Sequence, residues 1–335
     1  MGKIGFFFRR LARLDVKRFR ETFRELRSIT GKNPLSLILD LAWCGIRYNA
    51  GYMDYKIARM DRLNASQRRT VITRGISNSI VRRMNDKAYW HFFDDKCEFN
   101  RTFAQWVRRA FIRADETLTE EALAAFCRGK GPLFIKPLEG SSGVGVERAE
   151  PEDFADTAAF LKRVKGKGVC IIEETVVQHE EMARLYPGSV NTVRIATMLG
   201  EKAEGIVYAF LRIGNGRVMD NVDAGGMAAR VDLETGVLNS LAADKKGHEF
   251  SSHPLTGTQI TGFQLPYFKE AKEMCLQAMR VVPQVRFVAW DVAITPEGPT
   301  LIEGNSFPSH AVPQFAAHYP DGIGILPEFE KYITL

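Results

Sequence analysis

Three side chains that carry oxygen ligands lie close together near the C-terminal end, within WDVAITPEGPTLIEGN at 290–305. Asp291 belongs to one apolar run, and Glu303 and Asn305 stand two positions apart in the next run. Alternate side chains of a strand share one face, so Glu303 and Asn305 point the same way. If the two runs pair across the intervening Pro-Gly turn, the three oxygens converge. Such hard donors suit Mg²⁺, which proteins bind through one or two carboxylates together with nucleotide phosphates.

The alternative for this triad is the solvated face of a hairpin. Its neighbours are apolar, Trp290 and Leu301 among them, which indicates buried strands. A buried carboxylate needs a partner, and a metal ion is one.

A lysine followed by small residues forms a second candidate site. Lys136 ends the run PLFIKP, and the loop EGSSGVGV follows at 139–146. Lysine can meet phosphate charge at a strand end, and glycines let backbone N–H groups approach phosphate oxygens. No Walker A ending and no GxGxxG spacing is present, so a glycine-rich hairpin turn stays open as the alternative. The candidate loop residues are Gly140, Ser141, Ser142, Gly143 and Gly145.

Two other apolar runs carry charge. Glu173 and Glu174 follow VCII, where a strand that enters a hinge could offer an acid and backbone groups to adenine or ribose. Taken alone, a strand end in solvent is the favoured interpretation.

Arg194 lies in SVNTVRIATML, and an arginine among apolar neighbours is rarely left unpaired. Its fork suits phosphate or carboxylate, with a structural ion pair as the alternative.

The rest of the sequence argues against several classes of protein. The six histidines show no HExxH and no zinc-ligand spacing, and no GxSxG motif supports hydrolysis by a protein nucleophile. The five cysteines are scattered without a CxxC pair, which disfavours a disulfide framework and indicates a reducing cytoplasm. The 335 residues, 45% of them hydrophobic, suffice for a sizeable core. The apolar stretches fall far short of the roughly 18 residues of a membrane span.

The net charge of +6 is concentrated in one segment. Residues 1–30 hold nine basic and three acidic side chains, and the remaining residues balance. Phenylalanines and leucines interleave with the basic residues at loosely helical spacing. A solvated basic face is the plain interpretation. The functional one is peripheral contact of residues 1–27 with the inner face of an anionic membrane. Nucleic acid is disfavoured, because the rest of the chain has no basic surplus.

The elements that must position these residues are helical first and β-rich later. Residues 1–90 have helix formers and little regular alternation, and Asp94–Asp95 offer an N-cap before a helix that begins at Lys96. A short strand is predicted at 108–113 and helices at 120–129, 152–165 and 266–281. Further strands are predicted at 132–137, 169–177, and from 190 onward.

In this order, FIKPLEGSSGVGV, CIIEE, NTVRIAT, GGMAARVD and WDVAI with LIEGN resemble the ATP-grasp superfamily. The likeness to its sugar-transfer associated group adds VMDNVDAGG and SHPLTG. The resemblance covers about residues 91–310. It implies an α+β fold in which two lobes sandwich ATP. The expected divisions are a helical region at 1–90, a first lobe at 91–177 with the glycine-rich loop, and a second lobe at 178–335 with the Mg²⁺ site.

The resemblance also implies roles. Lys136 and the 139–146 loop would hold the phosphates, and Lys96 fits the family's other nucleotide lysine, with Lys87 in reserve. Ala289 stands where some ligases carry an arginine, so the oxyanion donor must come from elsewhere, with Arg230 or Arg212 as candidates. The remaining assignments are Glu173, Glu174 and Val176 to adenine, Glu181 or Glu180 to ribose, Arg194 to phosphate, and Asp291, Glu303 and Asn305 to Mg²⁺.

The implied activity is Mg²⁺- and ATP-dependent ligation of a small-molecule carboxylate to an amine through an acylphosphate, on a sugar-linked or cell-envelope precursor. Catalysis would rest on positioning and electrostatics. A small-molecule kinase on the same scaffold and a non-catalytic nucleotide-binding adaptor are the alternatives. The sequence names neither substrate and leaves the oligomeric state open.

Overall fold

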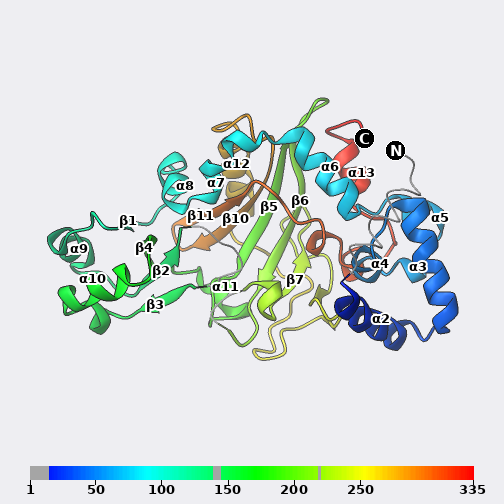
Figure 1. Ribbon diagram of the computed structural model, residues 1–335, viewed down its shortest axis with the longest axis horizontal. Coiled ribbons are helices and arrows are strands. Elements are labelled where there is room, and N and C mark those ends of the chain that lie inside the picture. Colours follow the sequence, from blue (N-terminus) through cyan, green and yellow to red (C-terminus); the bar gives the residue numbers. More distant parts are fainter. Residues whose placement is uncertain (1–14, 139–144, 218–219) are drawn as a thin grey trace.

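The computed structural model describes residues 15–138, 145–217 and 220–335. It is an α+β protein with two antiparallel sheets and a helical N-terminal region, as the sequence predicts (Figure 1). The three parts follow one another along the long axis of the molecule in Figure 1, with the larger sheet in the centre. None of the described helices is long and apolar enough to cross a membrane.

The N-terminal region is a small helical cluster around its own core. Asp15 caps the first described helix by accepting from the Arg18 N–H over 3.0 Å, and Gly31 ends that helix with a φ of 64°. Buried Leu26, Leu37 and other apolar side chains fill the space between the helices. The helices are α2 (Val16–Thr30), α3 (Pro34–Tyr48), α4 (Tyr52–Ile57), α5 (Ala65–Arg69) and α6 (Arg74–Met84).

The smaller sheet has four strands in the order β1-β4-β2-β3 and packs against α9 (Glu120–Cys127) and α10 (Thr157–Lys165). The helix α10 begins five residues later than the sequence predicts, because Asp156 caps it by accepting from Ala159 N–H over 3.0 Å. The strands are β1 (Phe111–Ala114), β2 (Leu133–Pro137), β3 (Glu147–Ala149) and β4 (Cys170–Glu174).

The larger sheet has seven strands in the order β11-β10-β5-β6-β7-β8-β9. One face packs on α12 (Phe268–Ala278) around the fully buried Trp290, and the other packs on α6 and α13 (Leu326–Glu330). The strands are β5 (Thr192–Leu199), β6 (Glu204–Ile213), β7 (Met227–Arg230), β8 (Ala242–Ala243), β9 (Glu249–Phe250), β10 (Phe287–Thr295) and β11 (Gly298–Asn305).

Short helices connect these parts. Between the sheets lie α7 (His91–Asp94), α8 (Lys96–Thr102) and α11 (Glu180–Leu185). The 3-10 helices are η1 (Met60–Arg62), η2 (Lys87–Tyr89), η3 (Pro151–Phe154), η4 (Val222–Ala224), η5 (Val312–Gln314) and η6 (Ala316–His318).

The helix pair α7–α8 lies directly on β11. Asp95 caps α8 by accepting from the Cys97 and Glu98 N–H groups, as predicted. A Cβ at Gly304 would lie 2.9 Å from the ring of Phe93, so only glycine permits this close approach. The packing brings the first turn of α8 beside the end of β11.

Candidate functional site

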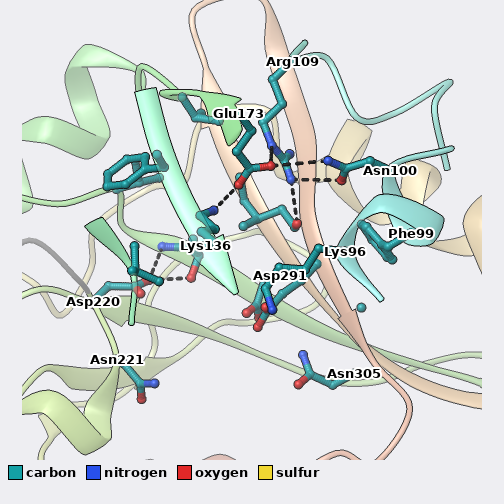
Figure 2. Close-up of a pocket in the computed structure, with 18 of the residues that line it drawn as sticks. Lys96, Phe99, Asn100, Arg109, Lys136, Glu173, Asp220, Asn221, Asp291 and Asn305 are labelled. Atoms are coloured by element: carbon teal, nitrogen blue, oxygen red, sulfur yellow. Dashed lines mark hydrogen bonds and ion pairs between the residues drawn. The ribbon is translucent and has the colours of Figure 1, made fainter. Parts of the chain in front are cut away.

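A cavity of about 1350 Å³ opens between the two sheets. Its walls come from α8, β2, the connector after β4, β10 and β11, which are far apart in the sequence (Figure 2). The cavity gathers charged side chains of both signs, and several of them are buried. The site residues of the sequence analysis that line it include Lys96, Lys136, Glu173, Glu174, Val176, Asp291, Glu303 and Asn305.

Asp291 is the centre of the charge network on the large sheet. It is fully buried on β10 and stands opposite Arg194 of β5 in the strand register. Arg194 grips it with both Nε and Nη2, the latter 2.8 Å from Oδ2, and the Nη2 of Arg212 lies 3.0 Å from the same oxygen. Burial alone would raise the pKa of Asp291, but the two guanidiniums outweigh it and hold that pKa below its ordinary value. The carboxyl therefore stays ionised.

Glu303 and Asn305 lie beside this centre, so the structure brings the predicted triad into one cavity. Asp291 pairs with Glu303 and Ala289 with Asn305 in the β10–β11 ladder, and a register shift follows Asp291. Burial and the adjacent Asp291 charge raise the pKa of Glu303. The Asn305 amide donates to the Ala289 carbonyl over 3.3 Å, which leaves its oxygen for another partner.

A second layer of polar contacts fixes Arg212. Its Nε donates to the Thr192 hydroxyl over 2.9 Å, and its Nη2 lies 3.3 Å from Asp220. Asp220 also accepts from the Thr192 N–H over 2.9 Å. Burial raises the pKa of Asp220, while the charge of Arg212 opposes that shift. Figure 2 shows Asp220 and Asn221 on the side of the cavity opposite Asn100.

Lys136 and Glu173 form the corresponding charge centre on the small sheet. They lie on the neighbouring strands β2 and β4, and the Lys136 ammonium is paired with Glu173 Oε1. Glu173 Oε2 accepts from Arg109 Nε over 2.7 Å and from the Asn100 amide over 3.3 Å. Burial alone would raise the pKa of Glu173, but Arg109 and Lys136 together lower it to about 2.

The connector after β4 runs along the cavity wall. Glu174 pairs through its side chain with Lys130 at 2.5 Å and accepts from the Ala110 N–H at 2.7 Å. Glu174 and Val176 both line the cavity. The Glu174 N–H donates to the Ala110 carbonyl over 3.0 Å, so the backbone contacts of Glu174 and Val176 with adenine stay predictions.

Both lysines considered as the earlier nucleotide lysine line the cavity, but in different settings. Lys96 donates to the Leu138 carbonyl over 3.1 Å, directly before the glycine-rich loop. Burial lowers the pKa of Lys96, and the charge of Glu303 opposes this shift while that of Lys136 adds to it. Lys87 lies on η2 and is exposed.

Several candidate residues, Arg194, Glu181 and Arg230 among them, are not part of the cavity wall. Glu181 is on α11 and pairs with Arg184 at 2.7 Å. Arg230 is on β7, with its guanidinium 4.5 Å from the ring centre of Tyr319. Neither side chain is among those that line the cavity. The ribose and oxyanion roles of these residues stay predictions.

The glycine-rich loop lies only partly within the described part of the chain. Gly145 is described, has a φ of 76°, and a Cβ there would lie 2.9 Å from Pro137 at the end of β2. Both observations require glycine where the loop rejoins the sheet. The other loop candidates, Gly140, Ser141, Ser142 and Gly143, lie outside the described residues.

Comparison with known families adds to this geometry. The model of a family described as sugar-transfer associated ATP-grasp matches residues 76–323. The chain belongs to this family. The match spans the cavity walls and both sheets, and it begins within α6. No curated protein matches the chain in sequence.

Among solved structures, this ATP-grasp chain is similar to the ATP-grasp ligase PsnB with a minimal precursor, at 14% identity and a TM-score of 0.39 over 68% of this chain and 56% of that chain. The similarity to VanG D-Ala:D-Ser ligase from Enterococcus faecalis has 15% identity and a TM-score of 0.43, over 71% of this chain and 60% of that chain. The similarity to D-cycloserine synthetase DcsG has 11% identity and a TM-score of 0.44, over 77% of this chain and 76% of that chain. The chain thus spans less than two thirds of the first two. These similarities bear on neither substrate nor reaction.

Sequence reasoning did not name Arg109, Asn100 or Asp220, all of which line the cavity. Arg109 joins both sheets, because it pairs with Glu173 and its Nη1 and Nη2 donate to the Leu301 and Ile302 carbonyls over 2.6 and 2.9 Å. Asn100 accepts from Arg109 and donates to Glu173. Arg109 sits in the basic stretch RRAFIR, which gave no sign of burial; the polar Asn100 within the apolar periodicity of 96–107 was the available signal.

Proposed function

We propose that this chain is an Mg²⁺- and ATP-dependent ligase that joins a carboxylate to an amine through an acylphosphate. The supporting observation is one cavity, lined by Lys96, Lys136, Arg109 and Arg212, that also holds the carboxylate–carboxylate–amide triad. The proposal also rests on membership of the ATP-grasp family. Cationic side chains in an enclosed cleft are the arrangement that stabilises a transferring phosphoryl group.

The triad fits Mg²⁺ on the chemistry of its donors. The described residues hold no cluster of three or more His, Cys, Asp or Glu side chains able to bind a metal alone. Two carboxylates and an amide oxygen are hard donors of the kind that Mg²⁺ takes in addition to nucleotide phosphates. Burial and the adjacent Asp291 charge raise the pKa of Glu303, and a cation between the two carboxylates would offset their repulsion. When bound, Mg²⁺ would supply charge neutralisation at the phosphates.

The reaction needs no protein nucleophile. A substrate carboxylate oxygen forms a bond to the γ-phosphorus while the bond to the β,γ-bridging oxygen breaks, which releases ADP. The amine nitrogen then attacks the acyl carbon, phosphate leaves, and the amine proton is lost. We assign the phosphates to Lys96, Lys136 and the 139–146 loop, and the acylphosphate oxygens to Arg194, with Arg230 as the other catalytic candidate. In this proposal Glu173, Glu174 and Val176 contact the adenine, and Glu181 binds the ribose hydroxyls.

The charge network explains how these groups would be held. Asp291 orients Arg194 and Arg212 from a buried position, and Glu173 orients Lys136. Preorganised charge of this kind costs no reorganisation during the reaction. The substrate class we propose, a sugar-linked or cell-envelope precursor in the cytoplasm, rests on the family. Contact of residues 1–27 with a membrane belongs to the same proposal.

Product analysis tests the ligase assignment. The protein is incubated with Mg²⁺, ATP and a metabolite extract, and products are identified by mass spectrometry alongside ADP and phosphate release. We expect a new amide, with ADP and phosphate formed in equal amounts and only when both a carboxylate and an amine are present. A phosphorylated hydroxyl without free phosphate would show a kinase, and nucleotide binding without turnover would show an adaptor. Glu303→Gln serves as the inactive control.

A further inference from the structure

The helix α3 is apolar on two opposite faces, which is unusual for a helix at the surface. Its inner face buries Leu37 and Cys44 in the N-terminal core. Its outer side chains are large, apolar and exposed, at 66, 48, 61, 56 and 37% for Leu35, Ile38, Leu39, Trp43 and Ile46 respectively. We call these five residues the α3 stripe. A helix that is hydrophobic all round is normally covered on all sides.

The contacts of Asp40 on the opposite side of α3 show that the α3 stripe faces away from the N-terminal core. Asp40 lies on the inner side of α3 and accepts from Arg68 Nη1 and Nη2 over 2.7 and 3.0 Å, and from the Tyr55 hydroxyl over 2.7 Å. This partly buried ion pair fixes the rotation of the helix about its axis. The α3 stripe must therefore face outward in the folded protein.

The charge beside α3 is positive. The turn between α2 and α3 has a hollow lined by Arg24, Arg27 and Lys32, and the two arginines have no ion-pair partner within the described part of the chain. The only acid in the α3 sequence, Asp40, is turned inward. The described residues 15–30 lead into α3 and carry five basic and three acidic side chains, and the sequence of the whole segment 1–30 carries the net charge of +6.

We propose that the α3 stripe lies in the surface of a bilayer that contains anionic lipid. Interfacial helices combine aliphatic side chains and tryptophan with neighbouring basic residues in this way. A second copy of the chain fits less well, because pairing of two stripes would bring two basic segments together. Nucleic acid would use the arginines but not the aliphatic side chains. The inference goes beyond the ligase reaction and does not depend on it.

Vesicle flotation of the full chain tests the proposal. Vesicles of phosphatidylcholine alone are compared with vesicles that also contain phosphatidylglycerol, at low and raised salt. We expect the protein to float with the anionic vesicles, and less so at raised salt. The double variant Leu39→Glu/Trp43→Glu should bind at least about tenfold more weakly. The matched control is Leu255→Glu, since Leu255 is 62% exposed on the loop after β9, and it should bind like the wild type.

Trp43 fluorescence gives a second measurement that does not depend on a charged substitution. Emission of the wild type should shift to shorter wavelength on anionic vesicles and be quenched by brominated lipid, and Trp43→Phe should lose both responses. Failure of the wild type to float, equal binding by the double variant, or an unchanged Trp43 signal would each overturn the proposal. So would a wild-type dimer that the double variant abolishes while vesicle binding persists. Product formation by a soluble double variant would leave the ligase proposal standing.

Discussion

Arg109 and Glu173 form a buried ion pair, with 2.7 Å between Nε and Oε2, at the junction of the two sheets. Glu173 is the penultimate residue of β4. Arg109 also donates to two carbonyls of β11. The pair therefore ties the small sheet to the large one. The same carboxylate holds Lys136, so the junction also positions a lysine of the proposed nucleotide site.

Glu173→Gln should lower the free energy of unfolding by about 3 kcal/mol at neutral pH, because it leaves the charges of Arg109 and Lys136 without their buried partner. The pKa of Glu173 falls from its ordinary 4.5 to about 2 on folding. A lowered pKa contributes stability above pH 4.5 and loses it as the pH falls toward 2. The difference in free energy of unfolding between wild type and variant should therefore shrink as the pH falls across that range. Urea unfolding at a series of pH values measures this difference.

Glu174→Gln is the matched control for that experiment. Glu174 pairs with Lys130, but its side chain is 36% exposed against 3% for Glu173. Exposed ion pairs contribute little to stability, so Glu174→Gln should lower the free energy of unfolding by well under half as much as Glu173→Gln. A pH-independent gap for Glu173→Gln, or equal losses for both variants, would contradict the role given to the Arg109–Glu173 pair.

The sequence allowed the β10–β11 pairing to be predicted, because strand alternation and a Pro-Gly turn place Asp291 opposite Glu303 within local sequence. It did not allow Asp220 or Arg109 to be assigned. Asp220 accepts from Thr192, 28 residues away, and Arg109 pairs with Glu173, 64 residues away, so packing of separate elements brings these groups together. Glu181 pairs with its near neighbour Arg184, and its ribose role stays a prediction. Long-range ion pairs depend on tertiary structure that local spacing does not encode.

Glu303→Gln and Asp291→Asn should separate catalysis from stability. Glu303 is only partly buried and makes no arginine ion pair among the described residues. The Glu303→Gln variant should therefore be as stable as the wild type, and its rate of ADP release should fall by about a hundredfold or more. Asp291→Asn removes the charge partner of Arg194 and Arg212 and should also lose about 3 kcal/mol of stability. Thermal unfolding and turnover, measured on both, check this; a stable and active Glu303→Gln protein would refute the assignment of the triad.

Arg194→Lys and Arg230→Lys should differ sharply. Lysine cannot reproduce the two-point grip of Arg194 on Asp291, so turnover should fall by about a hundredfold. Arg230 contacts Tyr319 and the His318 carbonyl away from the cavity wall, and its lysine variant should keep turnover close to the wild type. Steady-state rates decide between them. The reverse order would support the oxyanion role of Arg230 and contradict the acylphosphate role given to Arg194.

Lys96→Ala should weaken nucleotide binding more than Lys87→Ala. The Lys96 ammonium reaches the Leu138 carbonyl at the start of the glycine-rich loop and interacts electrostatically with Lys136 and Glu303, so it lies between the two charge centres. Loss of one charge-assisted contact there should reduce ADP affinity roughly tenfold to a hundredfold. Lys87 is exposed on η2 at the rim, where water screens its charge, and its removal should change affinity little. Calorimetric titration of each variant with Mg·ADP measures both, and a larger loss for Lys87→Ala would move the nucleotide to the outer part of the cavity.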